Sequence, residues 1–220
     1  ELSSNYKTWK EILTKSTLGN RRVVAMDTKG AGDAITLLLL CAPKDANTPL
    51  TCYEYNLQNK TLTEVDLPTN VTNITPYVEG INFQAKVQYA SNGDIWVGLG
   101  NTYGSRVVRV KDNTYRFYGS NSSGSWGGEA FVIKNNLMIK SSRTSGDADI
   151  LFKRLDNGNN YFSDNIDAEG IGMDSWITDF AIDYADNVFV ASNYHGRVIP
   201  ISMPYDGVRS TPAPSNQKFK

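Results

Sequence analysis

Apolar and polar residues alternate along most of this chain in short runs, and glycine, asparagine, aspartate and proline separate the runs. Runs of about four to eight residues bounded by such turn formers are typical of β-strands. The pattern therefore predicts strands grouped in four consecutive units. They are expected near residues 22–28, 34–41, 50–56 and 61–66; 84–90, 94–98, 106–111 and 114–118; 129–134, 137–142, 149–155 and 160–163; and 178–183, 187–192 and 197–202.

One segment near the N-terminus has a different period. Trp9, Ile12 and Leu13 recur at helical spacing, and Gly19 is a typical residue to end a helix. This spacing predicts a helix over residues 5–18.

One of the units occurs twice in recognisable form. Lys86–Gly98 reads as a short strand, a polar turn and a second strand, and Asp179–Ala191 is a degraded copy of it. In each case a third strand is expected to begin at an arginine, Arg106 or Arg197. A unit of this kind cannot bury its own apolar faces, so repetition predicts that the units stack against each other. Four strands in about 40–50 residues is the pattern of a β-propeller blade.

The repeat residues also resemble a known family. Asn92-Gly-Asp-Ile-Trp-Val-Gly98, followed by Gly104-Ser-Arg-Val-Val-Arg-Val110, is similar to the repeat of two-component-regulator-type propellers. Asp186-Asn-Val-Phe-Val-Ala191 resembles the same repeat with phenylalanine in place of tryptophan, and the likeness covers about half the chain. It implies an all-β propeller of about four four-stranded antiparallel blades. Trp96 and Phe189 are expected in the middle of strands, which favours burial in the core between blades over a role as a ligand platform. Members of such families are mostly recognition or sensor modules outside the cytoplasm.

The pattern divides the chain into three parts: a helical arm (1–20), the propeller or a portion of one (21–203) and a polar C-terminal tail (204–220). No clear fourth strand follows the third strand of the last unit. The chain is thus either a compact four-bladed ring with imperfect closure or part of a larger ring. An open arc would expose a sheet face and edge at each end, which favours association with another chain.

Charge and hydropathy exclude several partners. The formal charge of −1 arises from 22 basic and 23 acidic side chains that are mixed along the chain. Nucleic-acid binding needs a basic face or stripe, and none is present. The longest apolar run, Ile35–Pro43, is far too short to span a bilayer, so no membrane insertion is expected.

A binding surface is predicted where the loops between second and third strands meet the loops between blades. Tyrosine, tryptophan, asparagine and arginine suit sugars or peptides, because flat rings cover apolar faces while amides and guanidinium groups bond hydroxyls and carbonyls. The alternative is that asparagine and glycine only shape these turns while tyrosine packs over the blade edge. The candidate ligand-binding residues are Asn101, Tyr103, Arg106, Trp126, Arg143, Trp176, Asn193, Tyr194, His195 and Arg197.

No catalytic or metal-binding pattern accompanies these residues, and no cofactor is expected. His195 is the single histidine, and no positioned nucleophile or orienting acid is suggested near it. The acidic pairs of the chain lack the register of a calcium loop.

The two cysteines, Cys41 and Cys52, fall symmetrically about a proline-bounded turn. A hairpin would bring them opposite each other, within reach of a disulfide. A disulfide would imply an oxidising compartment. The alternative is two reduced, half-buried strand residues.

These features favour a non-catalytic recognition module that binds a glycan or a protein through one loop-rich face. Such a module would be extracellular or surface-exposed, in a periplasm or on the surface of a cell or particle. One alternative is an assembly subunit whose blade edges and terminal arms pack against another chain. A second alternative is a propeller hydrolase or lyase that uses carboxylates and a metal in the central channel.

Overall fold

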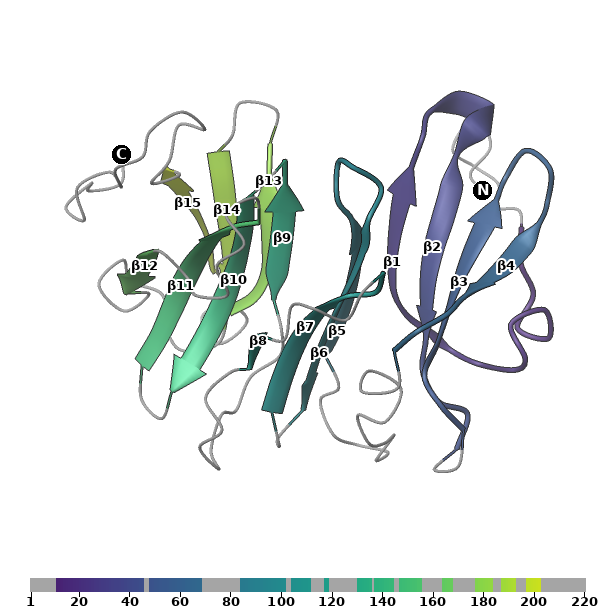
Figure 1. Cartoon of the computed structure of the whole chain (residues 1–220), viewed down its shortest axis with the longest axis horizontal. Coiled ribbons are helices and arrows are strands. Elements are labelled where there is room, and N and C mark those ends of the chain that lie inside the picture. The colour runs from purple at the N-terminus through teal and green to yellow at the C-terminus, as the bar shows by residue number, and fades with distance from the viewer. Residues whose placement is uncertain are drawn as a thin grey trace.

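A computed structural model describes residues 11–45, 48–68, 84–101, 104–111, 117–118, 130–135, 137–144, 147–155, 164–167, 177–183, 187–192 and 197–202. Within these residues the fold is all-β, and its strands form four antiparallel sheets (Figure 1). The strands of every sheet are hydrogen-bonded in chain order, so each sheet is a simple meander.

The four sheets have these strands. The first contains β1 (Val23–Lys29), β2 (Thr36–Cys41), β3 (Thr51–Asn56) and β4 (Leu62–Val65). The second contains β5 (Gln84–Tyr89), β6 (Ile95–Asn101), β7 (Gly104–Arg109) and β8 (Phe117–Tyr118). The third contains β9 (Phe131–Lys134), β10 (Leu137–Thr144), β11 (Asp147–Arg154) and β12 (Asp164–Asp167). The fourth contains β13 (Ile177–Ile182), β14 (Asn187–Ser192) and β15 (Arg197–Ser202).

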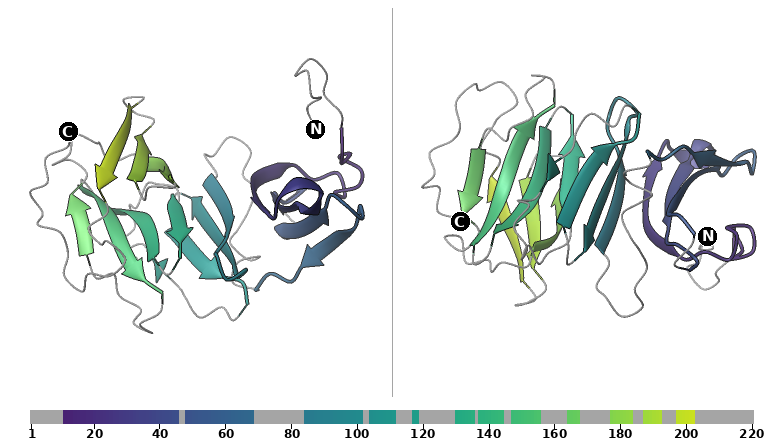
Figure 2. Two further views of the ribbon diagram at one scale, coloured as in Figure 1. Left: turned by 90° about the horizontal axis from the view of Figure 1, so that it is seen from above. Right: turned by 60° about the horizontal axis from the view of Figure 1, so that its bottom comes forward.

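The sheets stack face to face in chain order, with β1 beside β5, β5 beside β9 and β9 beside β13 (Figure 2). Each junction buries apolar side chains from both sheets, which is the main force that holds a stack of sheets together. The first junction joins Leu38, Leu40 and Cys52 to Val87, Val97 and Val108; the second joins Trp96 and Val107 to Phe131, Ile133 and Met138; the third joins Val132, Ile139, Ile150 and Phe152 to Phe180, Val188, Val190 and Ile201.

The first and fourth sheets lie at opposite ends of this array (Figures 1 and 2). In the part of the chain that the structure describes, the sheets do not close into a ring.

The sequence of β2 is apolar almost throughout instead of alternating, and the surroundings of the strand explain this. Leu38 and Leu40 point into the junction with the second sheet, whereas Leu39 and Cys41 point to the opposite face. That opposite face is covered in part by Leu18, so both sides of the strand are buried. A strand with two buried faces needs a continuous apolar run.

The strand predictions are confirmed for nearly every element, with boundaries that agree within about three residues. The largest difference is the last strand of the third sheet, predicted at 160–163 and found as β12. The fourth sheet has three strands among the described residues, as the sequence predicted.

The predicted helix over residues 5–18 is wrong for its described part. Residues 11–20 form bends and turns, and the only helix in the described ranges is a single 3-10 turn, η1 (Gly32–Ala34). The Thr14 hydroxyl accepts a hydrogen bond from the Thr17 amide, and such local side-chain bonds compete with helix formation. Leu18 and Leu13 instead pack on the outer face of the first sheet. Trp9 lies outside the described residues.

The predicted disulfide is also wrong, because Cys41 and Cys52 are both free. In the β2–β3 register Cys41 is opposite Thr51, while Cys52 is opposite Leu40. The one-residue offset places the two thiols on opposite faces of the same sheet, because side chains alternate across a strand. The symmetric spacing about the turn therefore does not produce a facing pair.

The two aromatic repeat residues differ in their burial. Trp96 is 1% exposed in the junction between the second and third sheets, as predicted. Phe189 is half-buried and points away from the third sheet, so its placement between two sheets is wrong. The reason is that the fourth sheet ends the described stack.

Adjacent leucines on β2 provide a test of this stacking. We expect Leu38→Ala to lower the free energy of unfolding by about 3 to 5 kcal/mol, because Leu38 is fully buried between two sheets. Leu37→Ala is the matched control on the other face, where the side chain is only half-buried, and should cost less than about 2 kcal/mol. Urea denaturation followed by tryptophan fluorescence measures both, and equal costs would contradict the stacking.

Candidate functional site

The strand register places four of the predicted ligand-binding residues near one end of the sheets. Asn101 is the last residue of β6 and pairs with Gly104, and Arg106 follows two residues later in β7. Arg143 pairs with Ala148 next to the β10–β11 connection, and Arg197 begins β15. Strands β7, β11 and β15, which begin near these residues, all start at the lower side of their sheets in Figure 1.

Four positions on three different sheets thus share one end of the stack. Their side-chain positions, and the other predicted residues, lie outside the described part of the structure. These other residues are Tyr103, Trp126, Trp176, Asn193, Tyr194 and His195.

A second group of polar residues, which the sequence analysis did not single out, lies along the first strands of the sheets. Strands β1, β5, β9 and β13 each pair with one neighbour only, so one edge of each carries backbone N–H and C=O groups without a ladder partner. Buried groups of this kind must find other partners.

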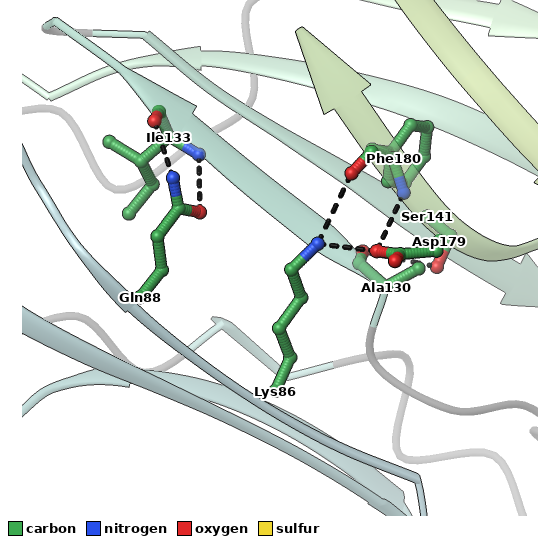
Figure 3. A network of polar contacts seen from close by, with 7 residues as sticks. All are labelled: Lys86, Gln88, Ala130, Ile133, Ser141, Asp179 and Phe180. Carbon is green, nitrogen blue, oxygen red and sulfur yellow. Dashed lines mark hydrogen bonds and ion pairs between the residues drawn. The ribbon is translucent and has the colours of Figure 1, made fainter. Parts of the chain in front are cut away.

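The side-chain amide of Gln88 in β5 supplies both a hydrogen-bond donor and an acceptor to the backbone of β9. Its Nε2 donates to the carbonyl of Ile133 at 2.7 Å, and its Oε1 accepts from the amide of Ile133 at 2.9 Å (Figure 3). The side-chain amide thereby imitates a neighbouring strand at one residue. This pairing fixes how far β5 and β9 are shifted along each other.

Lys86, two residues earlier on the same strand, reaches β13 (Figure 3). Its Nζ donates to the carbonyl of Phe180 at 3.2 Å and forms an ion pair with Asp179. The Asp179 carboxylate in turn accepts from the Phe180 amide at 2.8 Å. The lysine side chain is 24% exposed and the aspartate side chain 61%, so this ion pair contributes little by itself.

The same kind of contact joins the other neighbouring sheets. Asp27 of β1 accepts from the Tyr89 amide of β5 at 2.7 Å, and Lys134 of β9 donates to the carbonyl of Asp183 after β13 at 2.6 Å. At every junction a side chain of the earlier sheet thus binds backbone of a later one. These hydrogen bonds to backbone groups hold neighbouring sheets together.

A charged cluster lies at the junction of the first two sheets. Glu54 of β3 accepts at Oε1 from the Lys29 ammonium at 2.7 Å and from the Tyr89 hydroxyl at 2.6 Å. The Lys29 ammonium also lies 4.4 Å from the centre of the Tyr89 ring, within the range of a cation–π contact.

The cluster shifts the protonation of its members. Burial acts to raise the pKa of Glu54, but the hydrogen bonds from Lys29 and Tyr89 and the lysine charge outweigh it, so the pKa is lowered from 4.5. Burial, followed by the bond to Glu54, raises the pKa of the Tyr89 hydroxyl. Glu54 is therefore held as a carboxylate and Tyr89 as a neutral donor, a stable arrangement that does not favour proton transfer between them at neutral pH.

Both thiols are held in their protonated form. Burial raises the pKa of Cys41 to about 11, although the Arg21 charge opposes the shift. Burial, with the nearby Cys41 and Glu54, raises the pKa of Cys52 to about 12. Because the thiolate is the reactive form, neither cysteine is activated as a nucleophile.

No three histidine, cysteine or acidic side chains in the described ranges gather where they could hold a metal ion. Among the same residues, no helix is long and apolar enough to cross a membrane.

Comparison with known proteins adds no assignment, because no family model and no curated protein matches the chain. The resemblance to two-component-regulator-type propellers stays a prediction.

The Glu54 cluster predicts a pH dependence of stability. A carboxyl whose folded pKa is lowered contributes stability above its unfolded pKa and loses it as the pH falls through the folded value. We expect Tyr89→Phe to lower the free energy of unfolding by about 1.5 kcal/mol at pH 7, because a hydrogen bond to a charged acceptor is lost. The difference from the unsubstituted protein should shrink below about pH 4.5, the ordinary value for Glu54. Denaturation curves from pH 7 to pH 3 test this, and a difference that is constant with pH would contradict it.

Thiol titration checks the two free, buried cysteines. We expect the native protein at pH 8 to react with Ellman's reagent at least about tenfold more slowly than after unfolding, because both thiol pKa values are raised well above that pH. Unfolding without reductant should then release two reactive thiols. An absence of thiols after unfolding would indicate that the disulfide forms after all.

Proposed function

We propose that this protein is a non-catalytic recognition module with a propeller-type arrangement of sheets, which binds a glycan or a protein through one loop-rich end. The observation that carries the proposal is the placement of Asn101, Arg106, Arg143 and Arg197 near the same end of three successive sheets. A ligand spanning that end would meet residues from all three sheets at once.

The chemistry of these residues suits such a ligand. Guanidinium groups present a planar fork of donors to carboxylates, and amides bond hydroxyls and carbonyls in both directions. Aromatic residues of the adjoining loops, such as Tyr103, Tyr194 and Trp126, would cover apolar sugar faces or side chains. Rigid strands beneath the loops would hold the polar groups in position before the ligand arrives.

The hydrogen bonds made by side chains of the first strands (β1, β5 and β9) support a binding role over a catalytic one. Lys86, Gln88 and Lys134 donate to backbone carbonyls of neighbouring strands, and Asp27 accepts from a backbone amide. Acids and bases engaged in this way hold the sheets together.

A location outside the cytoplasm, in a periplasm or on the surface of a cell or particle, belongs to the same proposal. With the cysteines unpaired, this part is supported by the family resemblance alone.

A glycan and peptide array probed with the labelled protein tests the function. We expect at least one class of ligand to bind, and Arg106→Ala, Arg143→Ala and Arg197→Ala each to weaken its affinity by about tenfold or more. Lys111→Ala is the matched control, because this exposed cation follows β7 at the opposite end of the second sheet. Binding that none of the three arginine variants weakens, or no binding to either class, would contradict the proposal.

A further inference from the structure

The exposed apolar side chains of the described residues are confined to the two ends of the stack. The large hydrophobic residues that remain exposed are Val23 (37%) and Met26 (67%) on the first sheet and Val198 (65%) on the fourth. The second and third sheets, which have a neighbour on both sides, contribute none to this set. Apolar surface left at the ends of a repeated stack indicates where the stacking would continue.

The exposed residue of the fourth sheet belongs to a broader apolar face. Val198 pairs with Ala191, and Phe189 lies between Ala181 and Pro200 in the register of β13, β14 and β15. These residues lie on the face opposite to Val188 and Val190, which pack on the third sheet. We call this surface the trailing face, defined by Ala181, Phe189, Ala191, Val198 and Pro200.

The repeat shows what the trailing face is built to contact. Phe189 occupies the same position in its unit as Trp96 does in the second sheet. Trp96 is buried against the next sheet along the chain, on Phe131, Ile133 and Met138. The trailing face is therefore the kind of face that, elsewhere in this molecule, packs against a following sheet.

The first sheet presents the counterpart. Its face toward the second sheet carries Leu38 and Leu40, so its outward face is the kind that receives a preceding sheet. Val23 and Met26 lie on this side, because they pair with Cys41 and Leu39. We call this surface the leading face, defined by Val23, Met26 and Tyr53; the adjoining Leu39 and Cys41 are buried beneath the chain's own Leu13 and Leu18. Leu13 and Leu18 cover part of it, while Met26 stays exposed.

We propose that the trailing face of one copy of this chain packs on the leading face of a second copy. The two faces lie at opposite ends of the stack and do not meet within one described chain (Figures 1 and 2). A second copy supplies the missing face with the same kind of apolar junction that already joins neighbouring sheets. The contact is head to tail, so it either closes into a ring of copies or extends further.

This association goes beyond the recognition role and is independent of it. The trailing and leading faces are sheet surfaces, whereas the proposed ligand site lies at the end of the sheets where the second strands lead to the third. Loss of one leaves the other measurable.

Solution mass at several concentrations is the first test. We expect the protein to have at least twice its monomer mass of 24.3 kDa at micromolar concentration and to dissociate on dilution. Sedimentation velocity or light scattering measures this. A monomer at all concentrations up to about 100 µM, where even weak specific association is populated, would overturn the proposal.

Charge placed on either face should disrupt the contact. Met26→Glu and Val198→Glu should each weaken association by at least about tenfold, because a carboxylate would be buried in an apolar junction. Both side chains are about two-thirds exposed, so the fold should tolerate the change, and circular dichroism checks this. Ser91→Glu in the exposed β5–β6 turn is the matched control and should associate normally. If all three variants associate like the unsubstituted protein, the faces are not the interface.

Mixing the two variants tests the head-to-tail arrangement. Met26→Glu keeps an intact trailing face and Val198→Glu an intact leading face. Each alone should be monomeric, whereas an equimolar mixture should form a dimer through the one intact junction. A mixture that stays monomeric while the unsubstituted protein associates would overturn the head-to-tail contact.

Discussion

The burial of apolar sheet faces between neighbouring sheets is the constraint on which this structure depends. No four-stranded meander in the chain can hide both of its faces by itself. Neighbouring sheets cover one another, and Leu13 and Leu18 cover part of the outer face of the first sheet. Trp96 illustrates the result: its side chain is almost fully buried, although polar turn residues precede its strand in the sequence. Stability is therefore distributed over the junctions rather than concentrated in one central core.

Apolar stacking brings the sheets together but does not fix their relative shift, because hydrophobic contact is not directional. The polar side chains of the first strands supply that direction. Gln88 pairs with the backbone of Ile133 in both directions, and Asp27 and Lys134 make similar bonds at the other junctions. These residues thus satisfy some of the backbone groups at the free strand edges and help to set the register between sheets.

The role of these polar side chains in joining the sheets bears on function. Along the first strands, Asp27, Gln88 and Lys134 bond to backbone groups of the neighbouring sheet. Lys29 and Lys86 pair with the carboxylates of Glu54 and Asp179. The raised pKa values of Cys41 and Cys52 keep both thiols protonated at neutral pH, and the lowered pKa of Glu54 keeps its side chain a carboxylate. The described structure also brings Asn101, Arg106, Arg143 and Arg197 near one end of three sheets, and it leaves Met26 and Val198 exposed on the first and last sheets.

The sequence by itself determined the strands and their grouping, because alternation and turn residues act over a few neighbouring positions. The apolar repeat also predicted that Trp96 is buried. The sequence did not determine pairing across space: Cys41 and Cys52 are symmetric about their turn, yet the register places them on opposite faces. Nor could it show that Phe189 lies on the last sheet of the stack, or that residues 11–18 pack without forming a helix. These outcomes depend on which surfaces meet, and only the tertiary structure decides that.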